Sequence, residues 1–162
     1  MSASPSPVEM ATRSGRIGGL RTAECDMFLG IPFAQPPVGP LRFRPPQPPK
    51  PWDHPLDCVR FAAPPIQAER VPRVTGPGVP PPSEDCLYLN VWKPRAAGPH
   101  PIYVWIHGGA NVEGSSSMPV MDGSRFARKG IVCVSITYRL GVFGFLELGE
   151  LLGPEYAGSG NN

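Results

Sequence analysis

The chain has 162 residues, enough for about one domain with a buried core. Its net charge is only +2 and its basic residues are scattered, so no basic run is present that would bind a nucleic acid backbone. The first residues lack the apolar core of a secretory signal, and no stretch approaches the roughly eighteen apolar residues of a membrane span. We therefore expect a cytoplasmic protein that binds neither nucleic acid nor membrane.

Proline and glycine are unusually frequent. The 19 glycines and 24 prolines exceed a quarter of the chain, a level at which disorder has to be considered. Seventeen of the prolines lie between Pro32 and Pro82, where they interrupt helices and central strands. An ordered meander packed on the surface is favoured over a flexible linker, because large apolar residues recur in this stretch: Ile31, Phe33, Leu41, Phe43, Trp52 and Phe61.

Short strands around turns are expected in the first thirty residues, with Ser14-Gly15 and Gly18-Gly19 as the turn-forming pairs. Residues 87–92 form the next predicted strand. Its apolar residues occupy both alternating positions, which predicts burial on both faces.

Residues 102–106 and 131–138 are the two strongest predicted strands, and both are apolar runs typical of buried sheet strands. A short helix is expected between them, with Asp122 or Ser124 as its N-cap and an end near Gly130. Strand, helix and strand in this order predict a βαβ crossover and a parallel sheet. Residues 140–152 are apolar and interrupted by glycines, so we expect them to pack closely on the rest of the chain.

The four cysteines, at positions 25, 58, 86 and 133, form no C-x-x-C pair, so the sequence predicts no zinc site or redox motif. The sequence neither requires nor excludes disulfides among these four cysteines. Cys133 lies in an apolar run and is expected to be a small buried thiol.

The most informative segment is the end of the apolar run at 102–106. It continues into His107, Gly108, Gly109 and Ala110 and then into a loop of small residues. Such a loop can present bare backbone amides to a site. Two fixed amides can stabilise an oxyanion that forms on an attacked carbonyl, by roughly 3 kcal/mol per donor.

Residues 84–94, from Glu84 to Pro94, resemble the second signature of the type-B carboxylesterases, the α/β-hydrolase group that includes cholinesterases and neuroligins. Residues 30–43 resemble the family's N-terminal meander, 105–110 its oxyanion loop, and 138–145 the strand and turn that follow. The resemblance implies that residues 1–162 are the N-terminal part of a single α/β-hydrolase domain, incomplete at the C-terminus. It further implies a mixed, mostly parallel sheet with a proline-rich wrapping meander.

The resemblance assigns roles to the loop. The backbone amides of Gly109 and Ala110 would form the oxyanion hole, and Gly108 would let the chain bend close to the substrate. His107 would brace the loop by hydrogen bonds and would not be the catalytic base. On the residues alone, His107 is equally well a strand-end histidine without a special role.

The family's catalytic serine stands in G-x-S-x-G and is followed by an acid and a histidine. None of these is found in the 162 residues, and the other two histidines, His54 and His100, lie in proline-flanked loops where surface positions are expected. The mechanism implied for the intact protein is acyl transfer through an acyl-enzyme, without metal or cofactor. The chain alone is expected to be inactive.

Three scaffold features are also implied by the resemblance. Arg42 and Glu84 would form an ion pair that ties the meander to the core, and Arg139 would pair with an acidic residue beyond Asn162. In secreted members, the cysteine at the position of Cys86 forms a disulfide with an earlier cysteine, and this chain has Pro65 at that earlier position. Cys86 is therefore expected to be a free thiol, as in a reducing compartment.

Three functions therefore compete. The favoured one is a carboxylic ester hydrolase acting on a small-molecule ester. The alternatives are a non-catalytic, neuroligin-like binding protein and an α/β-hydrolase acting on lipid, lactone or thioester substrates. The oligomeric state is open.

Overall fold

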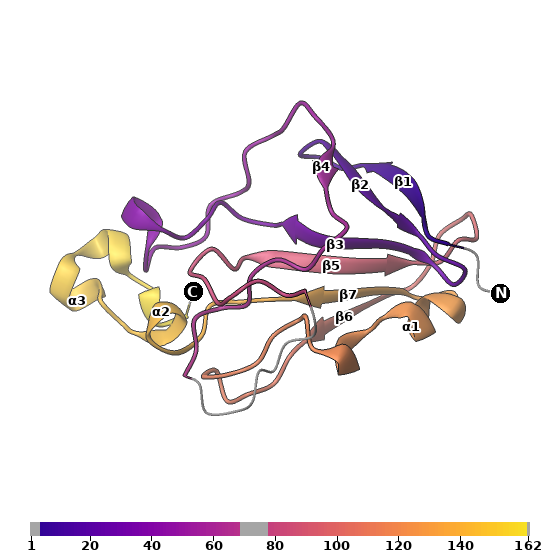
Figure 1. The fold of residues 1–162 in the computed structure, drawn as a ribbon. Coiled ribbons are helices and arrows are strands. Elements are labelled where there is room, and N and C mark those ends of the chain that lie inside the picture. The colour runs from indigo at the N-terminus through magenta and orange to yellow at the C-terminus, as the bar shows by residue number, and fades with distance from the viewer. Residues whose placement is uncertain (1–3, 69–77, 162) are drawn as a thin grey trace.

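The computed structural model describes residues 4–68 and 78–161 and shows one twisted sheet with the order β1-β2-β3-β5-β7-β6 (Figure 1). A short strand, β4, pairs with β2 outside this path. The strands are β1 Ser6–Ala11, β2 Arg16–Arg21, β3 Asp26–Pro32, β4 Leu56–Asp57, β5 Tyr88–Lys93, β6 Ile102–Ile106 and β7 Val132–Ile136.

The sheet is mostly antiparallel, so the expectation of a mostly parallel sheet was wrong. The pairs β1·β2, β2·β3, β3·β5 and β5·β7 are antiparallel, whereas β6·β7 and β2·β4 are parallel. Tight turns join the first three strands, and such turns reverse the chain direction. Among the described residues only β6 and β7 are linked through a helix, so the βαβ crossover predicted there is confirmed.

The predicted N-terminal strands and the turn at Ser14-Gly15 are confirmed, with the amide of Thr12 donating to the carbonyl of Gly15 at 2.9 Å. A turn at Gly18-Gly19 is not found, because both residues lie inside β2. Gly19 is needed there for space, since a Cβ atom on it would lie 2.4 Å from the carbonyl oxygen of Met27.

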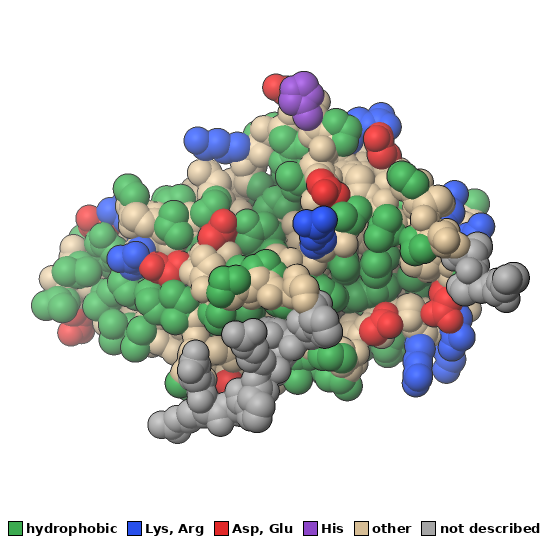
Figure 2. Space-filling model, in the orientation of Figure 1, with side chains coloured by type: hydrophobic (Ala, Val, Ile, Leu, Met, Phe, Trp, Pro, Cys, Tyr) green, Lys and Arg blue, Asp and Glu red, His purple; other side chains and the backbone are tan. Residues whose placement is uncertain are grey.

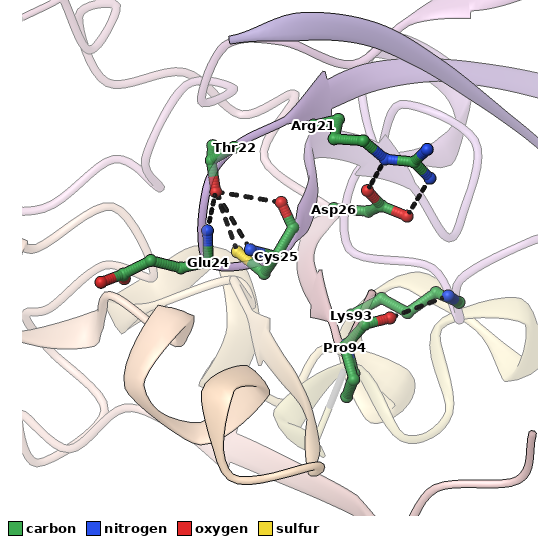
Figure 3. Close-up of polar contacts among 7 residues, drawn as sticks. All are labelled: Arg21, Thr22, Glu24, Cys25, Asp26, Lys93 and Pro94. Atoms are coloured by element: carbon green, nitrogen blue, oxygen red, sulfur yellow. Dashed lines mark hydrogen bonds and ion pairs between the residues drawn. The ribbon is translucent and has the colours of Figure 1, made fainter. Parts of the chain in front are cut away.

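The turn between β2 and β3 is built by Thr22 instead. Its hydroxyl donates to the carbonyl of Cys25 at 3.0 Å and accepts from the amides of Glu24 and Cys25 (Figure 3). Figure 3 also shows Arg21 and Asp26 pointing toward each other across the two strands, with Nε and Oδ1 2.7 Å apart. The guanidinium of Arg21 lowers the pKa of Asp26 and so keeps this buried carboxylate ionised.

The helices are short: α1 Ser124–Arg128, α2 Gly141–Phe145 and α3 Gly149–Leu152. Helix α1 has Gly123 at its N-cap, and the carboxylate of Asp122 accepts a hydrogen bond from the amide of Ser124 at 2.9 Å. Four short 3-10 turns, Gly39–Leu41, Pro119–Met121, Pro154–Tyr156 and Ser159–Asn161, complete the described helical structure. No helix in the described residues has the length and apolar character needed to cross a membrane.

Three apolar clusters form the core of the described residues. One joins Trp92 of β5, Ala127 of α1 and Cys133 of β7, which confirms that Cys133 is a buried thiol. The second contains Phe28 of β3 and Cys58 of the meander, and the third contains Ala34, Cys86 and Leu87.

The meander is ordered where it is described, as expected. The indole Nε1 of Trp52 donates to the carbonyl of Arg16 at 2.7 Å, and Trp52 and Leu56 pack on the second cluster. Residues 69–77 of the expected meander lie outside the described residues.

Strand β6 is present but exposed, so its predicted burial was wrong. Ile102 and Ile106 are 68% and 63% exposed. The reason is position, because β6 is the last strand of the described sheet and only β7 pairs with it. Figure 2 shows hydrophobic side chains over much of the visible face, with charged side chains scattered between them.

Candidate functional site

The loop that follows β6 begins at His107, which is 2% exposed. Its ring stacks on that of Tyr138, with the ring centroids 4.5 Å apart. The hydroxyl of Tyr138 donates to the carbonyl oxygen of His107 at 2.9 Å. Two contacts therefore fix the start of the loop to the segment that follows β7.

The protonation of His107 follows from its contacts. Its Nδ1 lies 2.9 Å from the carbonyl oxygen of Gly108, which can only accept, so Nδ1 carries the proton. The buried Nε2 has no partner among the described residues. Burial lowers the pKa of His107, partly opposed by the bond to Gly108, so the imidazole is neutral near pH 7.

Gly109 and Ala110 form a tight turn directly after the strand. Gly109 has φ 125°, and Ala110 and Asn111 follow at 51° and 61°, in the left-handed region. The carbonyl of Gly109 accepts hydrogen bonds from the amides of Val112 at 3.0 Å and Glu113 at 3.1 Å. A Cβ atom on Gly109 would lie 1.8 Å from the carbonyl oxygen of Glu113, so only glycine fits.

The backbone amides of Gly109 and Ala110 are left unused. Within residues 4–68 and 78–161, neither donates a hydrogen bond. Gly108 and Ala110 are exposed, and a Cβ atom on Gly108 would meet nothing within 4 Å. The turn thus holds two backbone amides that are unpaired among the described residues, in a part of the loop where Gly108 and Ala110 are exposed.

Behind this turn lies a buried polar network centred on Asn90 of β5. Its Nδ2 donates to the hydroxyls of Ser116 at 3.1 Å and Ser135 at 3.0 Å, and its Oδ1 accepts from the amide of Gly30. Ser116 also contacts the hydroxyl of Thr137 at 2.5 Å. The network attaches the far part of the loop to β5 and β7. No role for Asn90 was predicted from the sequence, although a polar residue between Leu89 and Val91 was a usable signal.

The expected ion pair of Arg42 and Glu84 is confirmed, with two hydrogen bonds of 2.5 and 2.6 Å.

Arg139 is buried and donates from Nη1 to the carbonyl of Arg44 at 3.0 Å, while its Nε and Nη2 have no partner in the described part of the chain. Cys86 is a buried free thiol, as expected, and burial raises its pKa to about 12.

The other histidines lie away from the loop turn. His54 is exposed. His100 is half-buried, with its ring nitrogens near the carbonyls of Ala96 and Gly130. No group of three or more metal-binding side chains is found in the described residues.

The same arrangement of strands occurs in solved structures. A carboxylesterase from Geobacillus stearothermophilus matches with a TM-score of 0.84 and 42% identity, covering 94% of this chain and 30% of that one. At this similarity the chain has the α/β-hydrolase fold of the carboxylesterases.

Sequence comparisons agree with the structural match. The model of the carboxylesterase family matches residues 6–159, and the chain belongs to this family. The fumonisin B1 esterase of Sphingopyxis macrogoltabida is 46% identical over 140 residues, which cover 83% of this chain and 25% of that protein. The para-nitrobenzyl esterase of Bacillus subtilis is 40% identical over 141 residues, covering 86% and 29%. The chain thus spans about a quarter of the length of the curated relatives that it matches.

Proposed function

We propose that this chain supplies the oxyanion-hole side of a serine carboxylesterase. The observation that carries the proposal is the turn at Gly109 and Ala110, whose two amides are unpaired among the described residues and lie at the end of β6. We call residues 107–114 the oxyanion loop. Membership of the carboxylesterase family supports an ester as the substrate class.

The two amides act when the substrate carbonyl is attacked. A serine outside these 162 residues adds to the carbonyl carbon, and the carbonyl oxygen takes up negative charge in the tetrahedral intermediate. The N–H groups of Gly109 and Ala110 donate to this oxygen and contribute roughly 3 kcal/mol each. Collapse of the intermediate releases the alcohol and leaves an acyl-enzyme, which water hydrolyses to the acid.

His107 and Gly108 support the loop in this proposal. The neutral, buried ring of His107 stacks on Tyr138 and donates to the carbonyl of Gly108, so it braces the backbone just before the donors. Gly108 has no side chain and open space beside it, which lets the substrate approach the backbone.

The substrate would be a small-molecule carboxylic ester. The relatives differ in the esters that their names specify, fumonisin B1 in one and a para-nitrobenzyl ester in another, so the family alone does not select one. We also propose a cytoplasmic location, which is supported by four free, buried cysteines. A neuroligin-like binding role would have no chemical need for two free amides at this turn.

The test uses a hybrid enzyme, because the 162 residues contain no G-x-S-x-G motif. This chain replaces the segment that it matches in the Bacillus subtilis para-nitrobenzyl esterase, and hydrolysis of para-nitrophenyl acetate is measured. The isolated chain is expected to be inactive and the hybrid active. Semisynthesis with glycolic acid in place of Gly109, or L-lactic acid in place of Ala110, replaces one N–H by an ester oxygen and adds no side chain. Each replacement should lower kcat by about 100- to 1,000-fold with little change in KM.

Gly18→Ala is the control for the hybrid, because a Cβ atom on this residue of β2 would meet only the carbonyl of Leu56, at 3.7 Å. This variant should keep the activity of the parent hybrid. Turnover that survives both ester replacements would rule out the oxyanion role of the turn.

A further inference from the structure

The far end of the oxyanion loop is held by a side chain from the proline-rich meander. The amide of Gly114 donates to Oε1 of Gln67 at 2.9 Å, and Nε2 of Gln67 donates to the carbonyl oxygen of Gly114 at 3.0 Å. One side-chain amide thus satisfies both backbone polar groups of a buried residue, as a neighbouring strand would. No role for Gln67 was predicted from the sequence.

Gln67 is itself carried by anchored backbone. Pro64 and Pro65 are fully buried, and proline fixes the backbone φ angle. The amide of Ser83 donates to the carbonyl of Pro64 at 2.9 Å, and Pro65 and Ser83 form a parallel bridge. Nε2 of Gln67 also lies 3.2 Å from the carbonyl oxygen of Pro65, which limits the side chain to one orientation.

The position of Gly114 controls the start of the loop as well as its end. Gly114 has φ 121°, and a Cβ atom on it would lie 2.3 Å from Nδ1 of His107 and 2.6 Å from the carbonyl oxygen of Gly108. The backbone of Gly114 therefore packs directly on the imidazole and on the peptide that precedes Gly109. A displacement of Gly114 would release both.

We propose that Gln67 is a positioning residue that sets the geometry of the oxyanion loop through Gly114. The inference rests on the proposed function of the loop. Two other contacts also fix it, from the hydroxyl of Tyr138 to the carbonyl of His107 and from the amide of Gly141 to the carbonyl of Asn111 at 2.7 Å. Both come from the segment after β7, whereas Gln67 supplies the hydrogen bonds that tie the loop to the described part of the meander.

The placement of the loop can be tested on the 162-residue chain by amide hydrogen exchange. Gln67→Met keeps the unbranched shape and removes both hydrogen bonds, so exchange of the Gly114 amide should accelerate about tenfold. Gln67→Glu keeps the acceptor for this amide and removes the donor, so protection of Gly114 should be largely retained. Gln47→Met is the matched control, because Gln47 is an exposed meander residue with a 3.4 Å contact to the carbonyl of Pro45.

The consequence for chemistry is measured in the active hybrid. Since misplacement of a catalytic group by about 1 Å can cost about 100-fold, Gln67→Met should lower kcat by about 10- to 100-fold and leave KM nearly unchanged. Gln67→Glu should give an intermediate kcat, and Gln47→Met should match the parent. A purely structural contact would instead lower the amount of folded hybrid without changing kcat per folded molecule.

The two proposals fail in different ways. Unchanged exchange at Gly114 in Gln67→Met would overturn the positioning role, as would faster exchange with an unaltered kcat. A parent hybrid that folds but has no activity would count against the proposed function, and the exchange data would then decide by themselves whether Gln67 holds the loop.

Discussion

His107 and Tyr138 hold each other in two ways: their rings stack with centroids 4.5 Å apart, and the hydroxyl of Tyr138 donates to the backbone carbonyl of His107 at 2.9 Å. The strand that leads into the oxyanion loop is thereby tied to the segment that follows β7. His107 stands two positions before Gly109, the first proposed donor. Changes to either ring should therefore affect both the stability of the chain and the activity of the enzyme.

The first prediction concerns pH. Burial lowers the pKa of His107 below its ordinary value of 6.5, so the unfolded chain binds this proton more tightly than the folded chain. The free energy of unfolding should therefore fall as the pH drops below about 6.5. Above that value the stability that the neutral His107 ring contributes is fully present. Urea unfolding between pH 5 and pH 8 measures this, and His107→Gln should flatten the dependence. Gln47→Met provides the control, since it changes an exposed side chain that carries no titratable group and should leave the curve unaltered.

The second prediction isolates the hydroxyl of Tyr138. Tyr138→Phe keeps the stacked ring and removes one hydrogen bond, so the free energy of unfolding should fall by about 1 kcal/mol. In the hybrid enzyme kcat should also fall. Tyr103→Phe on the exposed strand β6 is the matched control, and an equal loss in both variants would contradict a special role for Tyr138.

The third prediction concerns the thiols. All four cysteines are free and buried, and burial raises the pKa of Cys58 to about 11 and of Cys86 to about 12. Because the thiolate is the reactive form, native protein at about pH 8 should react slowly with a disulfide reagent. After unfolding in guanidinium all four thiols should react at once. Rapid labelling of the native chain would contradict the burial of the four thiols.

The fourth prediction concerns Arg139. Its buried guanidinium has two nitrogens without a partner among the described residues, and burial lowers its pKa. A buried charge without a counter-ion costs stability, so Arg139→Met should raise the free energy of unfolding of this chain by about 1–3 kcal/mol. Arg125→Met, at an exposed position of α1, should have little effect. A strong destabilisation by Arg139→Met would mean that its hydrogen bond to Arg44 outweighs the burial of the charge.

The fifth prediction concerns the exposed edge strand. Strand β6 has no charged residue, Val104 is 52% exposed, and such an edge favours pairing with another chain. The isolated chain should self-associate with increasing concentration in sedimentation velocity, and Val104→Lys should suppress this. Val120 is 75% exposed but lies outside the strand, so Val120→Lys should not.

The fold was predictable where the signal is local. The apolar runs at 102–106 and 131–138, with a short helix between them, predicted the βαβ crossover that joins β6 to β7. The direction of the other strands was not predictable, because the apolar pattern of a strand reports its burial and does not identify the strand that pairs with it. Gly18 and Gly19 misled for a related reason, since a glycine needed for close packing looks the same in sequence as one needed for a turn.

The sequence by itself determined the family and the identity of the loop residues His107 to Ala110, because these follow from contiguous motifs. The pairing of Arg42 with Glu84, which are 42 positions apart, came from the resemblance to the family. Only the tertiary structure decided what holds the loop: Asn90 lies 26 positions before Ser116, and Gln67 lies 47 positions before Gly114. Hydrogen bonds between such distant residues depend on how the meander and the sheet come together, and no local pattern of residues records that distance.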